Sequence, residues 1–136
     1  MAVDLEHLST LEQAAEKLDQ EQQSSTEIAT TRLALFLKAH AVGKTEFAEQ
    51  QFKLGVEALR AGSYEERAYA DALSQQGKTE TEQLLRLPMM PEHKRVILAA
   101  LGVRDPEHKE KYFALARKLN FERSVPWAFL QDFLAP

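Results

Sequence analysis

The segment SSTEIATTRLALFLKAHAVG, residues 24–43, indicates the fold class of this chain most directly. Ser24 and Glu27 have the spacing of a capping box, in which the serine oxygen accepts a backbone amide and the glutamate reaches back to the serine amide. Residues 33–37 are apolar on every side of a helix, which predicts a central position in a bundle. Gly43 is a natural helix end, because glycine adopts the left-handed conformation at little cost.

The same helical period extends through the rest of the chain. Thr45 is expected to cap the next helix, and Ser63 with Glu66 has the spacing of another capping box. A helix that starts at Pro91 is expected to end before Gly102. The predicted helices cover residues 4–23, 24–42, 45–61, 63–76, 79–87, 91–101, 105–120 and 125–134. Because short loops favour antiparallel neighbours, we predict an all-α fold, an irregular bundle of seven or eight short antiparallel helices.

Length and composition limit the class of protein further. The chain has 136 residues, which fits a single helical domain over residues 1–136. It has 44% hydrophobic and 28% charged residues, as globular domains do, and no cysteine for disulfides, thiolate metal sites or nucleophiles. Apolar runs fall far short of the ~18–20 residues of a membrane span, and the acidic start differs from a secretory signal. We expect a soluble, cytoplasmic protein that does not enter a membrane.

Charge divides the chain into two parts. Residues 1–85 hold 8 Lys and Arg against 15 Asp and Glu, a net of −7, whereas residues 86–136 hold 9 against 6, a net of +3. Pro-Met-Met-Pro at residues 88–91 is the strongest helix breaker and a candidate hinge between the acidic N-terminal part and the basic, aromatic-rich C-terminal part. The overall net charge of −4 argues against general nucleic-acid binding.

The last predicted helix is the most unusual stretch of the chain. It carries Trp127, Phe129 and Phe133, and only two of the residues from 125 to 134 are polar. A helix this apolar is either buried in its own fold or docks on a partner. Burial is the interpretation we favour, and partner docking is the alternative.

Residues 47–76 contain a second indication of partner binding. Leu54-Gly55, followed by Gly62-x-Tyr64-Glu-Glu66, resembles the inner turn of a tetratricopeptide repeat. The resemblance departs from the repeat at Arg67, where a small residue is expected, and no second copy is visible. It implies two antiparallel helices and the binding of a peptide or protein.

These observations lead to a functional prediction. We predict a non-catalytic protein–protein interaction module, an adaptor or regulator, with partner contacts at Tyr64, Trp127, Phe129 and Phe133. We predict no catalytic residue, metal ligand or cofactor. The acidic side chains lie in predicted helix caps and solvated faces, and the serine, histidine and acidic residues form no known catalytic motif. The protein partner is left unidentified and the oligomeric state open, with a monomer favoured over self-association.

One alternative is a DNA-associated protein. Residues 96–119 could form a helix-turn-helix, whose second helix would offer basic contacts to nucleic acid. These candidate contacts are Lys109, Lys111, Arg117 and Lys118. Glu107 and Glu110 stand where base-reading residues would lie, which counts against this alternative and makes nucleic acid an unfavoured partner.

The other alternative is an enzyme that uses His40, which is expected to be buried on the central helix. A lone histidine in a core is usually a hydrogen-bonded packing residue, so we favour the structural interpretation. Asp105 and His108 have an acid–x–x–His spacing that places both side chains on one helix face, as in helical metal sites. Because they open a helix, we interpret Asp105 as an N-cap instead.

Overall fold

The computed structural model describes residues 16, 25–75, 86 and 91–119, and 90% of these residues are helical, with no strand among them. This part of the chain forms α2 (Ser25–Ala41), α3 (Thr45–Arg60), α4 (Tyr64–Gln75), α6 (Pro91–Arg104), a 3-10 turn η1 (Pro106–His108) and α7 (Lys109–Lys118). The all-α prediction is confirmed. The count of seven or eight helices is not, because the helices predicted at 4–23, 79–87 and 125–134 fall outside the described residues, except for Glu16 and Arg86. Residues 88–90 of the predicted hinge also fall outside them.

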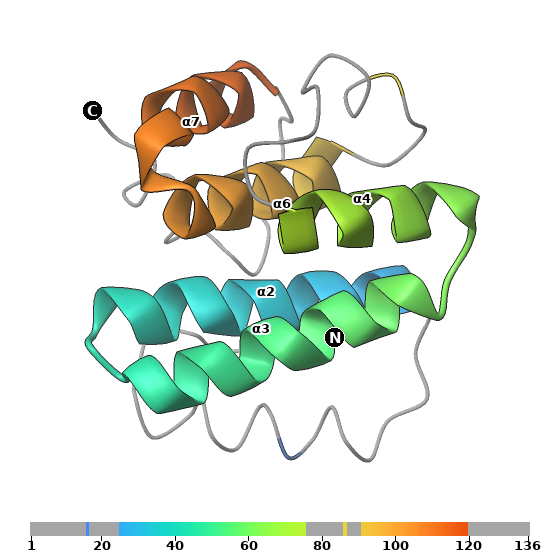
Figure 1. Cartoon of the computed structure of the whole chain (residues 1–136), viewed down its shortest axis with the longest axis horizontal. Helices are drawn as coiled ribbons and strands as arrows, with labels where there is room; N and C mark the ends of the chain where they lie inside the picture. Colours follow the sequence, from blue (N-terminus) through green and yellow to red (C-terminus); the bar gives the residue numbers. More distant parts are fainter. Residues whose placement is uncertain (1–15, 17–24, 76–85, 87–90, 120–136) are drawn as a thin grey trace.

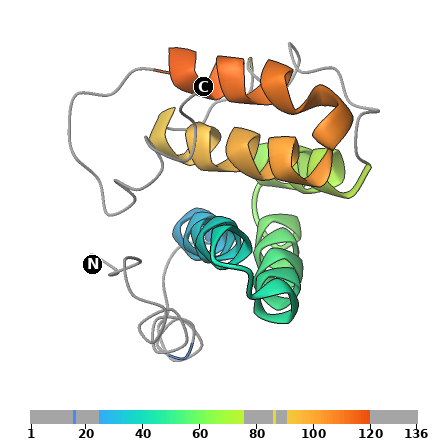
Figure 2. The same cartoon turned by 90° about the vertical axis from the view of Figure 1, so that its left-hand side faces the viewer.

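The helices are arranged as two crossed pairs with α4 beside them (Figure 1). α2 and α3 form an antiparallel hairpin, and α4 returns antiparallel to α3. Figure 2 shows α2 and α3 end-on while α6 and α7 run across the view, so the second pair crosses over the first. α6 faces both α2 and α4, and α7 packs on α6.

The core is centred on two helices that are buried on nearly all sides. Residues 33–37 of α2 are all buried, which confirms the central position predicted from their apolar run. Residues 96–102 of α6 are buried in the same way. α2 packs against α3 and α6, and α6 packs against α2, α4 and α7, and the buried apolar side chains of these helices form one cluster. None of the described helices has both the length and the apolar character that crossing a bilayer requires.

Several predicted helix ends are confirmed and others are wrong. Gly43 ends the turn after α2 with a φ of +85°, in the left-handed region. Thr45 is not a cap: Lys44 takes the N-cap position, and Thr45 is the first helical residue. α6 continues past Gly102 to Arg104. The missing side chain at Gly102 is used for packing, because a Cβ atom there would lie 2.5 Å from the ring of Phe113.

Candidate functional site

The start of α4 places an aromatic side chain in solvent. The Ser63–Glu66 capping box is confirmed: Glu66 N donates to Ser63 Oγ at 3.4 Å, and Glu66 Oε1 accepts from Ser63 N at 3.3 Å and from Ser63 Oγ at 3.1 Å. Tyr64, the first residue of the helix, lies inside this box and is 70% exposed. The box fixes the backbone on both sides of Tyr64, so its ring projects from a defined position.

α4 has a buried face and an exposed face. Tyr69, 1% exposed, lies in the core, and burial raises the pKa of its phenol to about 12. We define the outer face of α4 by its exposed residues, Tyr64, Arg67, Asp71 and Ser74. These residues fall at helical steps of three and four, which places them on one side of the helix.

The polar residues of this outer face differ in their contacts. Ser74 Oγ accepts a hydrogen bond from Arg60 Nη2 of α3 at 2.7 Å. Arg67 and Asp71 carry opposite charges four residues apart, yet neither takes part in a salt bridge within the described part of the chain. The outer face therefore presents one aromatic ring and two charges of opposite sign to solvent.

Of the four residues predicted to bind a partner, Tyr64 lies in the described part of the chain. Trp127, Phe129 and Phe133 lie outside the described residues. Tyr64 is exposed, and among the described residues the other large hydrophobic side chain that is exposed is Val42, at 47%. Val42 follows α2, at the opposite end of the α2–α3 hairpin from Tyr64, so the two do not form one patch. Among the described residues, the outer face of α4 is therefore the surface that exposes an aromatic side chain.

Two of the four residues predicted to contact nucleic acid have contacts within α7. Lys109 Nζ lies 5.3 Å from the centre of the Phe113 ring. Arg117 Nη2 lies 3.7 Å from Glu110 Oε2. Binding an anion with either side chain would compete with these intramolecular contacts.

Lys111 and Lys118 differ from this pair, because both are exposed and neither joins a salt bridge in the segments the structure describes. They lie seven residues apart, on the same side of α7. α6 and α7 run side by side in antiparallel directions (Figure 2), whereas the two helices of a helix-turn-helix cross at a wide angle. The lysines therefore form a short basic stripe on a helical hairpin.

His40 is exposed, so the prediction that it is buried is wrong. The cause is its position in the last turn of α2, one residue before the helix ends at Ala41. Its ring lies 6.1 Å from the ring of Phe36, centre to centre, as a tilted pair.

The acid–x–x–His pair makes an internal contact. His108 Nδ1 lies 2.9 Å from Asp105 Oδ2, and ligand atoms of these two residues and Glu107 all lie within 4.8 Å of one another. Asp105 occupies the predicted N-cap position, with Pro106 in the first turn, but its side chain makes no capping hydrogen bond. A cation at this place would meet the positive end of α7, which disfavours it. The carboxylate instead orients the imidazole.

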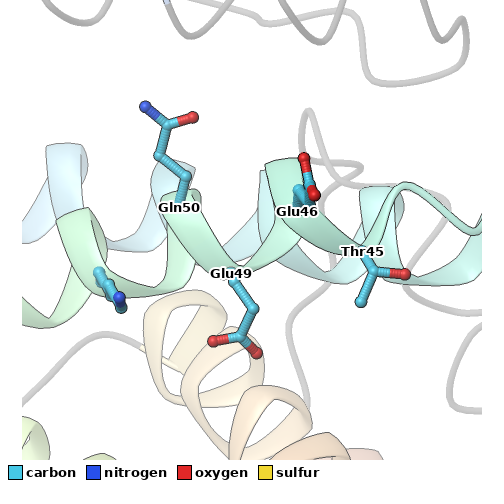
Figure 3. A pocket seen from close by; sticks show the side chains of 5 residues that line it. Thr45, Glu46, Glu49 and Gln50 are labelled. Atoms are coloured by element: carbon cyan, nitrogen blue, oxygen red, sulfur yellow. The ribbon is translucent and has the colours of Figure 1, made fainter.

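One contact between α6 and α3 is not predicted by any pattern in the sequence. Arg104, the last residue of α6, forms an ion pair with Glu49, and its guanidinium carbon lies 4.3 Å from the centre of the Phe52 ring. Glu49 also lines an open depression of about 370 Å³ on α3. Figure 3 shows Glu49 and Gln50 pointing to opposite sides of the helix. Small-molecule sites have converging polar groups, so this depression is a poor candidate for one.

We compared the chain with protein-family models, with the sequences of curated proteins and with solved structures, and none of the three comparisons gives a match.

Proposed function

We propose that this protein is a non-catalytic interaction module that binds a protein partner through the outer face of α4. The observation that carries the proposal is Tyr64, which is 70% exposed on a backbone held by the capping box. Tyrosine is enriched in protein interfaces, because it has a large apolar ring and a polar hydroxyl. It also loses little conformational entropy when it binds, since it has few rotatable bonds.

The surroundings of Tyr64 support the same proposal. Arg67 and Asp71 lie on the same face of the helix and can form charged hydrogen bonds at the rim of an interface. A rim of polar groups around an aromatic anchor is the usual arrangement of a small binding site. The resemblance to the turn of a tetratricopeptide repeat lies in the same segment and implies the same kind of partner.

A photo-crosslinking amino acid at position 64 tests this proposal in the cells that make the protein. We expect one adduct of defined mass from position 64 and none from position 53, because Lys53 is exposed on α3 and serves as the control. With the crosslinked partner in hand, Tyr64→Ala should weaken binding about 30-fold, the effect of an interface hot spot. Absence of an adduct at position 64, or full affinity of a folded Tyr64→Ala variant, would contradict the proposal.

Nucleic-acid association is the second candidate function, and the exposed pair Lys111 and Lys118 supports it. We expect weak binding near physiological salt, because two lysines neutralise few phosphates and the net charge of the chain is −4. A gel-shift assay with duplex DNA at low and physiological salt measures this. A sub-micromolar complex that Lys111→Ala weakens would place nucleic acid ahead of a protein partner.

A further inference from the structure

The exposed residues on the outer face of α4 have the same spacing from either end of the helix. Tyr64, Arg67, Asp71 and Ser74 follow one another at steps of three, four and three. Alternating steps of three and four form the seam along which two helices pack. The two charged residues are the inner members of the set and have opposite signs. A face with this symmetry is complementary to its own copy when the two helices are antiparallel.

We propose that the partner on this face is a second copy of the chain, with the two α4 helices packed antiparallel; this inference rests on the proposed function. A two-fold axis through the middle of the face places Arg67 opposite Asp71 of the second copy, and Asp71 opposite Arg67 of the second copy. The two contacts are equivalent, as they are in any two-fold interface. Because neither residue joins a salt bridge in the described part of the chain, pairing breaks no such contact there.

Tyr64 and Ser74, at the two ends of the outer face, form the remaining contacts of the proposed interface. The same axis places Tyr64 opposite Ser74 of the second copy. Arg60 of the second copy bonds that serine, so its guanidinium lies close to the tyrosine ring and can interact with its face. A parallel arrangement would instead bring Arg67 against Arg67 and Asp71 against Asp71. Charge repulsion therefore selects the antiparallel orientation.

The size of the face sets the strength of this association. α4 has 12 residues and is about 18 Å long, so the contact is smaller than a standard protein interface. We therefore expect a transient dimer that forms as the protein concentration rises and that salt weakens. At low concentration the monomer favoured by the sequence persists.

Sedimentation velocity of the full chain, from about 10 μM to about 1 mM, tests the dimer over the range expected of a small interface. The mean sedimentation coefficient should rise with concentration. Arg67→Glu should lower the association constant at least about tenfold, because both equivalent contacts become repulsive. The charge swap Arg67→Asp with Asp71→Arg should restore the association. Lys53→Glu, the same change of net charge at an exposed position of α3, should leave it unchanged.

The results of sedimentation and crosslinking together separate this inference from the proposed function. A wild-type chain that stays monomeric throughout this range, or a folded charge swap that fails to restore association, overturns the inference. If crosslinking from position 64 then captures a different protein, the proposed function stands without the dimer. If crosslinking captures nothing, both fail. Circular dichroism of each variant ensures that a loss of association does not come from unfolding.

Discussion

Replacing Gly102 with alanine tests how α6 and α7 pack, because two opposing effects meet at this position. In the interior of an ordinary helix, Gly→Ala stabilises a protein by about 1 kcal/mol. Here the new Cβ atom would lie 2.5 Å from the ring of Phe113, a side chain that is itself buried. Forcing an extra methyl group into a packed core costs about 1–3 kcal/mol. The steric cost should win, and we expect a net destabilisation of about 1 kcal/mol.

A second substitution, Phe113→Leu, tests whether the collision with the aromatic ring causes the destabilisation. In a Phe113→Leu chain the colliding ring atoms are gone, so Gly102→Ala should stabilise the protein by up to about 1 kcal/mol. The sign of the effect should therefore reverse between the two backgrounds, with a coupling energy of about 1–3 kcal/mol. Urea unfolding of the four chains, followed by circular dichroism, gives all the free energies. Stabilisation by Gly102→Ala in the chain with the natural Phe113 would refute the close packing.

Three further predictions concern single contacts. Arg104→Ala should lower the free energy of unfolding by about 1–2 kcal/mol, and Glu49→Gln should lower it by less. The reason is that Arg104 stacks on the ring of Phe52, and this contact outweighs its partly exposed ion pair with Glu49. Thermal unfolding of the two variants compares the effects. Ser63→Ala should cost about 1 kcal/mol through loss of the cap, with Ser63→Thr as the conservative control, measured in urea. Burial raises the pKa of Tyr69 from 10.0 to about 12, so the stability tied to its neutral phenol is complete below pH 10 and is lost as the pH rises towards 12. A Tyr69→Phe chain should lack this part of the alkaline loss; an identical pH profile would contradict the assignment.

The helical class and several helix ends could be predicted, because short-range physics decides them. The box at Ser63 and Glu66 involves residues three positions apart, so their spacing alone indicates the contact. Gly43 needs only its own backbone conformation. The all-round apolar run of residues 33–37 can be stable only in a fully covered helix, which made a central position predictable.

The exposure of Tyr64 at the candidate site could not be predicted from local sequence. The sequence indicated it through the resemblance to a repeat turn, but its 70% exposure follows from the way α4 lies on α3 and α6. Its neighbours Arg67 and Asp71 were not predicted to act with it. The exposed face that they share with Tyr64 can be recognised only when the buried side of α4 is known, because that side determines which residues point outward.

Local sequence is enough to predict the helical period, the box that starts α4 and the turn at Gly43, since each depends on residues within one or two turns of each other. Packing between helices, by contrast, is needed to explain why Gly102 lies inside a helix, why His40 is exposed and why Arg104 binds Glu49, 55 positions away. These outcomes depend on which helices come together, and a local sequence pattern does not identify the residue of another helix that will lie in contact. Glycine ends a helix where the chain must turn, but it continues one where the ring of Phe113 needs the space.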